Sequence, residues 1–245
     1  EWIDDIKYEF VGLAMPITRI DTNKKHEFAR IKNLGTLAFS IGYLRMGEME
    51  KRDENRKFLN ETFTAYDAVG TISYSQLINP KISVGVNLKV IHQVIEEETA
   101  NGFAFDLGLL HKLQVTGYKL QVGAVIHNLG PKMKFIKEGY NLPLTVSGGL
   151  AYKILGVCNL GLNVTHRVFE KRTDFGFGTE YWFGNILALR GRYNLTNPNN
   201  QLTNNQLTRF GAGLGFKLSN YQIDYSFIPY ADLGNTHRFS FTARF

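Results

Sequence analysis

The chain has 245 residues, 20% of them charged, and a mean hydropathy of -0.18. A helical membrane protein would be far more apolar, and no run of about 18 apolar residues occurs, so transmembrane helices are excluded. The net charge of +6 does not indicate nucleic-acid binding, because the cations are scattered and the densest charged run, residues 48–57, carries both signs.

Alternation of apolar and polar residues runs through the chain from the first segment to the last. In a β-strand successive side chains point to opposite faces, so each such segment has one apolar and one polar face. The first segment is weak, and we interpret Ile6, Tyr8, Phe10 and Ala14 as its apolar set. The predicted strands cover residues 6–14, 35–44, 66–75, 82–90, 103–109, 120–126, 144–154, 159–167, 174–183, 187–193, 209–217, 221–227 and 235–245.

The last of these segments shows why the pattern indicates a membrane. Phe239, Phe241 and Phe245 alternate there with polar and basic residues. A soluble β-sandwich would bury such a face against a second sheet, whereas a β-barrel in lipid exposes it to hydrocarbon. Because the same polarity recurs in every predicted strand, we favour the barrel and keep a soluble β-sandwich binding module as the alternative.

The predicted fold class is therefore all-β, as a single domain that forms an antiparallel up-and-down transmembrane β-barrel in a bacterial outer membrane. We count about thirteen strands, with no amphipathic helix between them. First and last strands of an antiparallel barrel pair only when the strand number is even, so an odd count requires at least one further strand. We also expect an export signal to precede residue 1, and the further strand either to precede residue 1 or to be supplied by something else.

The connections between predicted strands alternate in length, as the two ends of such barrels do. The short, periplasmic class comprises residues 79–81, 114–117, 155–157, 184–186 and 219–220, and the mostly longer, extracellular class comprises residues 46–62, 96–102, 129–141, 196–206 and 229–234. One connection, residues 18–33, is long yet falls in the periplasmic class, and we interpret it as an insertion.

One hairpin can be predicted down to its residue pairs. If apolar residues share a face, Phe183 must pair with Leu187 across the turn at Gly184 and Asn185. That register sets Glu180 directly opposite Arg190. We therefore expect a cross-strand ion pair inside the barrel.

Ionisable side chains are numerous on the face predicted to line the lumen. Buried charges must be paired or hydrated, so they either form a structural network or mark a substrate path. The candidates for a ligand path are Asp67, Lys89, Asp106, Glu180, Arg190, Arg192, Arg209, Asp224 and Arg238, and further inward residues include Arg167 and Asp174. Inward glycines at 176, 178, 211, 213 and 215 could open a channel, or equally permit curvature or close approach of a plug.

No pattern indicates catalysis, a cofactor or a metal. The six histidines lack HxxxH or HxH spacing, and a single cysteine, Cys158, cannot form an intrachain disulfide or a cysteine metal cage. No GxSxG motif is present either, so we expect the protein not to be an enzyme.

Several segments resemble the PorV/PorQ family of outer-membrane proteins, which belongs to the FadL-like barrels. They include HNLGP within residues 122–135, EYWFG within residues 178–193 and DLGNTHRFS within residues 228–245. The resemblance implies a barrel embedded in outer-membrane lipid that carries a hydrophobic ligand, or alternatively an accessory of a type IX-like secretion system that receives cargo proteins. The family's N-terminal plug has no counterpart here, and the resemblance implies fourteen strands in the complete barrel. The C-terminal aromatics Phe241 and Phe245 resemble the signal for outer-membrane insertion.

Overall fold

The computed structural model describes residues 6–21, 30–53, 57–115, 118–135, 138–196, 209–229 and 235–245. The described residues contain no helix that is long and apolar enough to cross a membrane. The long strands are β1 (Lys7–Asp21), β2 (Arg30–Arg45), β5 (Ala65–Asn79), β6 (Ile82–Ile95), β7 (Glu98–Val115), β8 (Tyr118–Leu129), β11 (Thr145–Ile154), β12 (Cys158–Arg167), β13 (Arg172–Phe183), β14 (Leu187–Thr196), β15 (Phe210–Leu218), β16 (Tyr221–Pro229) and β17 (Asn235–Ala243).

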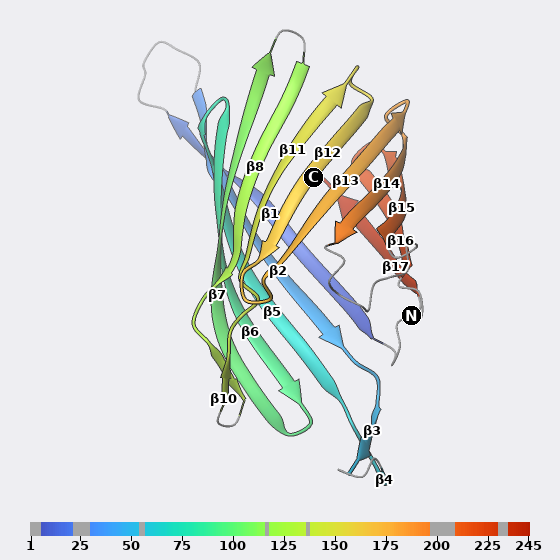
Figure 1. Ribbon diagram of the computed structural model, residues 1–245. Coiled ribbons are helices and arrows are strands. Elements are labelled where there is room, and N and C mark those ends of the chain that lie inside the picture. Colours follow the sequence, from blue (N-terminus) through green and yellow to red (C-terminus); the bar gives the residue numbers. More distant parts are fainter. Residues whose placement is uncertain are drawn as a thin grey trace. The chain divides into compact units, whose positions relative to one another are not determined.

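These strands form one sheet in the order of the sequence, apart from two short hairpins inserted between them. Every pairing whose register is described is antiparallel, for example β5 with β6 and β13 with β14. Each predicted strand is found, and the count of about thirteen agrees with the 13-stranded sheet of the described residues (Figure 1). The chain is thus an up-and-down meander.

The apolar face of the strands is exposed, which is the reverse of a soluble protein. Val90 is 62% exposed, Phe175 is 55% exposed and Phe241 is 66% exposed. Among the described residues the buried apolar side chains are few: Ala65, Ala100, Ala104, Met133, Leu142, Ala188 and Ile228. An apolar face this extensive is stable against hydrocarbon and not against water.

The chain divides into two compact units, which we describe separately. The N-terminal unit comprises Lys7–His111 and Val125–Leu144, and the C-terminal unit comprises mainly Lys112–Ala124 and Thr145–Phe245.

In the N-terminal unit, the predicted faces of residues 6–14 are wrong. The register places Leu13 opposite Phe39, and Phe10 opposite Gly42. Directly opposed residues share a face, so Leu13 lies on the apolar face of β2 and Phe10 on its polar face. The small side chains there make room for aromatic rings, since a Cβ atom on Gly42 would lie 3.0 Å from the Tyr8 hydroxyl. Both alternating sets of β1 are partly apolar, so only pairing decides between them.

The long connection expected at residues 18–33 is partly strand. β1 continues to Asp21 and β2 begins at Arg30, with a register shift at Ile17/Thr18. Gly35 has φ +139° beside this bulge, and a Cβ atom there would lie 2.6 Å from the Ser75 carbonyl oxygen. The bulge explains how the hairpin extends beyond the pairing with β5. The remaining residues, 22–29, lie outside the described part.

Two connections that we expected to be loops contain short hairpins. β3 (Met49–Arg52) pairs with β4 (Phe58–Phe63), and β9 (Met133–Phe135) pairs with β10 (Glu138–Tyr140). The β3–β4 hairpin projects past the ends of β2 and β5 (Figure 1). Its Lys51 forms an ion pair with Glu96, and the hydrogen bond to that carboxylate raises the pKa of Lys51.

Candidate functional site on the polar face

The C-terminal unit carries the predicted cross-strand ion pair at the centre of a larger network. Glu180 lies opposite Arg190, and Phe183 opposite Leu187, as the turn predicted. Arg190 Nε donates to Glu180 Oε2 at 2.8 Å, and Arg190 Nη1 donates to Asp224 Oδ1 at 2.5 Å. Asn159 Nδ2 also donates to Glu180, at 2.7 Å. Four strands, β12, β13, β14 and β16, are thus connected through one guanidinium group.

The inward glycines of β15 make this connection possible. β15 separates β14 from β16, with Gly213 opposite Arg190 and Gly215 opposite Asp224. A Cβ atom on Gly215 would lie 2.7 Å from Asp224 Oδ1 and 2.9 Å from Arg190 Nη1. Because Gly215 has no side chain, the Arg190–Asp224 ion pair has room to cross β15. This explains why glycine occurs at that position.

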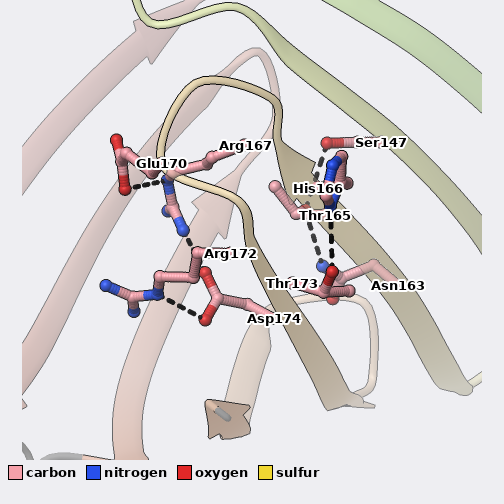
Figure 2. A network of polar contacts seen from close by, with 9 residues as sticks. All are labelled: Ser147, Asn163, Thr165, His166, Arg167, Glu170, Arg172, Thr173 and Asp174. Carbon is pink, nitrogen blue, oxygen red and sulfur yellow. Dashed lines mark hydrogen bonds and ion pairs between the residues drawn. The ribbon is translucent and has the colours of Figure 1, made fainter. Parts of the chain in front are cut away.

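A second polar network lies at the β12–β13 turn and is shown in Figure 2. Arg167 is directly opposite Arg172, and both cations contact Asp174, with Arg172 Nε at 2.9 Å from Asp174 Oδ1. Glu170 Oε2 lies 3.9 Å from Arg167 Nε. His166 Nδ1 and Thr173 Oγ1 are 2.9 Å apart, and by strand alternation they lie on the opposite face. Two opposed arginines are therefore neutralised by carboxylates.

Three candidate cations of the C-terminal unit lie apart from these networks. Arg192 is opposite Gly178 and Gly211, and Arg238 is opposite Ser226. Arg209 precedes β15 and is half-buried. No ion pair joins any of these three arginines to another residue of the described part.

In the N-terminal unit, Asp106 on β7 is the most deeply buried of the candidates, at 4% exposure. Lys89 Nζ lies 2.7 Å from Asp106 Oδ2, and Asn87 Nδ2 donates to the same oxygen at 2.9 Å. The backbone N–H of Asn128 donates to Asp106 Oδ1 at 2.9 Å, and His127 Nδ1 is 3.2 Å from Oδ2. A buried carboxylate is stable only with such partners.

The chain between β8 and β11 packs onto β7, and we call its described residues, 130–135 and 138–144, the covering segment. Met133 and Leu142, 1% and 5% exposed, pack with Ala100 and Ala104 of β7. A Cβ atom on Gly102 would overlap Met133 Cγ, so a larger residue there would require the Met133 side chain to move. Small residues on the polar face of β7 thus form a seat for this segment.

The covering segment is also held by a polar chain of contacts. The Tyr140 hydroxyl donates to Gln93 Oε1, and Gln93 Nε2 donates to Asp67 Oδ1 at 2.9 Å. Burial raises the pKa of the Tyr140 phenol, and the negative charge of Asp67 acts in the same direction. The phenol therefore stays a hydrogen-bond donor at neutral pH.

Within each unit the candidates form separate groups of contacts, and their place on a ligand path stays a prediction. Lys89 and Asp106 lie together, Asp67 contacts the covering segment, and Glu180, Arg190 and Asp224 form the central network. Gln222 Nε2 donates to Asp224 Oδ2 at 2.9 Å. Sequence reasoning did not identify the neutral partners, which are Asn87, Gln93, Asn128, Tyr140, Asn159 and Gln222. Strand parity could have found Asn87, Gln93, Asn159 and Gln222, because they alternate with apolar residues, whereas nothing local indicated Tyr140.

The remaining candidates, Phe241 and Phe245, lie at the C-terminal end. Phe241 stacks on Tyr221 on the apolar face with ring centroids 6.0 Å apart, and Phe245 is fully exposed. Their role in insertion stays a prediction. The described residues contain no group of three or more His, Cys, Asp or Glu side chains that could hold a metal ion.

The chain was compared with known protein families, curated sequences and solved structures. No protein-family model and no curated protein sequence matches the chain. Among solved structures it is similar to the toluene transporter TodX of Pseudomonas putida, with 12% identity over 97% of this chain and 86% of TodX, at a TM-score of 0.53. The monoaromatic hydrocarbon channel CymD matches at 10% identity, covering 98% and 88% of the two chains, with a TM-score of 0.53.

A TodX channel variant, deltaS2S3, matches at 13% identity over 99% of this chain and 91% of its own, with a TM-score of 0.55. The chain therefore shares the fold of these three structures, an antiparallel transmembrane β-barrel.

Proposed function

We propose that this protein is a non-enzymatic outer-membrane channel that conducts a hydrophobic ligand. The fold is shared with TodX and CymD, which are described as a toluene transporter and a monoaromatic hydrocarbon channel. The observation that carries the proposal is the covering segment, because Met133, Leu142 and Phe135 form an apolar cluster on an otherwise polar wall. An apolar ligand can replace such contacts at small cost.

The mechanism follows from how the covering segment is attached. Its apolar contacts with β7 are few, and its polar contacts run through Tyr140 and Gln93. A ligand arriving from the end with the long connections displaces Met133 and occupies the seat of Ala100, Gly102 and Ala104. The ligand then moves along the small side chains on the polar face of the sheet. The ion pairs between the other strands hold the sheet together meanwhile.

A reversible lock tests this mechanism. In a Cys158→Ser background, Gly102→Cys with Met133→Cys joins the covering segment to β7. We expect uptake of radiolabelled toluene into proteoliposomes to fall to background when the pair is oxidised, and to return after reduction. Oleic acid as a second probe separates monoaromatic from long-chain ligands.

The matched control is the single variant Met133→Cys in the same background, whose uptake should not respond to reductant. Uptake that is equal in the oxidised and reduced double variant would show that the covering segment does not lie on the path. Absence of uptake of both probes by the unaltered protein would reject hydrophobic transport.

The resemblance to PorV/PorQ, and with it the docking of cargo for a type IX-like secretion system, rests on the sequence segments alone. A pull-down from the native membrane discriminates: a stoichiometric secretion partner without bound lipid favours docking, and lipid without a partner favours transport. Deletion of Phe245 tests the proposed insertion signal. We expect less of the protein in the outer-membrane fraction of cells that express the shortened chain.

A further inference from the structure

The corrected register of β1 brings two cations together on the apolar face. Lys7 is the first residue of β1 and Arg45 the last residue of β2, and the register places them directly opposite each other. Arg45 lies on the same face of β2 as Ile41 and Phe39, which are 59% and 41% exposed. Lys7 and Arg45 are exposed as well. Both cations therefore point to the lipid side of the sheet.

Opposed like charges on a sheet repel each other, at a separation of about 5 Å between Cβ atoms. The opposed pair Arg167 and Arg172 is neutralised by Asp174 on the same face. Within the described residues, neither Lys7 nor Arg45 has an ion pair or a side-chain hydrogen bond. Glu9, the carboxylate on the same face, is opposite Tyr43 and contacts neither cation. An anion from outside this part of the chain would resolve the repulsion.

The surroundings of the two cations are those of a membrane–water boundary. Tyr66 lies directly opposite Arg45, and its ring is 5.5 Å from Tyr43 and 6.0 Å from His92. His92 Nδ1 is 2.7 Å from Asn101 Oδ1. Tyrosines concentrate at the headgroup level of a bilayer. Beyond Arg45 the chain continues into the charged β3–β4 hairpin, so the cations lie at the end of the span.

We propose that Lys7 and Arg45, flanked by Tyr43, Tyr66 and His92, bind the phosphate group of an outer-membrane glycolipid headgroup. Arg45 offers two parallel N–H donors to phosphate oxygens, and Lys7 adds a point charge from the neighbouring strand. The acyl chains of the lipid lie against Phe39, Ile41 and Leu13 below. This surface is separate from the transport path on the polar face.

Native mass spectrometry of the detergent-purified protein tests the proposal with bisphosphorylated lipid A as the probe. We expect Arg45→Ser and Lys7→Ser each to weaken retention of lipid A roughly fivefold. The matched control is Lys81→Ser, which removes one exposed cation in the short β5–β6 turn, and its retention should equal that of the unaltered protein.

A variant with the opposite effect guards against general damage to the barrel. Glu9→Gln removes the carboxylate beside the two cations, and we expect it to strengthen retention of lipid A, which loss of folding cannot do. Retention that is unchanged in Arg45→Ser and Lys7→Ser overturns the proposal, and so does a fall of the same size in Lys81→Ser.

The chemistry of the probe separates a lipid site from a simple anion site. Dephosphorylated lipid A should be retained as weakly by the unaltered protein as bisphosphorylated lipid A is by Arg45→Ser. If inorganic phosphate at the same concentration displaces lipid A completely, the cations hold an adventitious ion only, and the glycolipid assignment is wrong.

Discussion

The Asp106 cluster of the N-terminal unit and the Glu180–Arg190–Asp224 network of the C-terminal unit use the same chemistry in different surroundings. Each combines a carboxylate, a cation and an asparagine on the polar face, and each depends on nearby glycines. In the first, Gly102 lies beneath Met133 of the covering segment and Asp106 is 4% exposed, whereas in the second, Gly215 makes room for Arg190 and Asp224, whose side chains are 29% and 22% exposed. We therefore expect burial, more than charge, to decide how much each site contributes to the free energy of unfolding.

Removal of the Asp106 carboxylate should have the largest effect. Asp106→Ala leaves the Lys89 ammonium, on a side chain that is 19% exposed, with a hydrogen bond to Asn128 but without its carboxylate, and we expect a loss of about 3 kcal/mol in the free energy of unfolding. Asp224→Ala, at a more exposed site, should cost about 1 kcal/mol. Urea titration in lipid vesicles, followed by tryptophan fluorescence, measures both. Equal losses would contradict the dependence on burial.

Loosening the covering segment should come next. Met133→Ala leaves a cavity against Ala100 and Ala104, and we expect a local loss of about 2 to 3 kcal/mol. Hydrogen exchange should accelerate in residues 138–144 and remain unchanged in β13 and β14. The control, Met15→Ala, alters a methionine that is 44% exposed and should leave exchange in that segment unaffected.

Filling the space above β15 tests the role of glycine in the exposed network. Gly215→Leu collides with the Arg190–Asp224 pair and should cost about 1 to 3 kcal/mol in the same urea titration. Gly70→Ala is the control, because a Cβ atom there has nothing within 4 Å. A Gly215→Leu protein as stable as the control would mean that the ion pair contributes little.

Charge reversal within the network should have the smallest effect. Glu180→Arg disturbs the pairing with Arg190, and Arg190→Glu restores only part of it, because the new carboxylate then faces Asp224. Addition of Asp224→Asn should recover more, with a coupling of about 1 kcal/mol between sites in a multiple-mutant cycle. Strict additivity of the free-energy changes would reject the network.

Where sequence reasoning succeeded, the pattern was local. The β13–β14 register follows from parity and a three-residue turn, and so Glu180 was matched to Arg190 without a structure. Where it failed, the pattern was ambiguous or the contact distant: β1 has apolar residues on both faces, and nothing near Asp224 in the sequence indicates an arginine two strands away.

The sequence by itself determined the strands, their order and the apolar face that meets lipid, because a period of two is a local property that hydrocarbon on one side enforces along the whole chain. Only the tertiary structure decided which face of β1 carries Lys7, which carboxylate Arg190 contacts across β15, and that Met133 and Leu142 pack onto β7. These three features depend on the register between strands and on the space that glycines leave on a neighbouring strand. Neither property can be read from the sequence of a single strand.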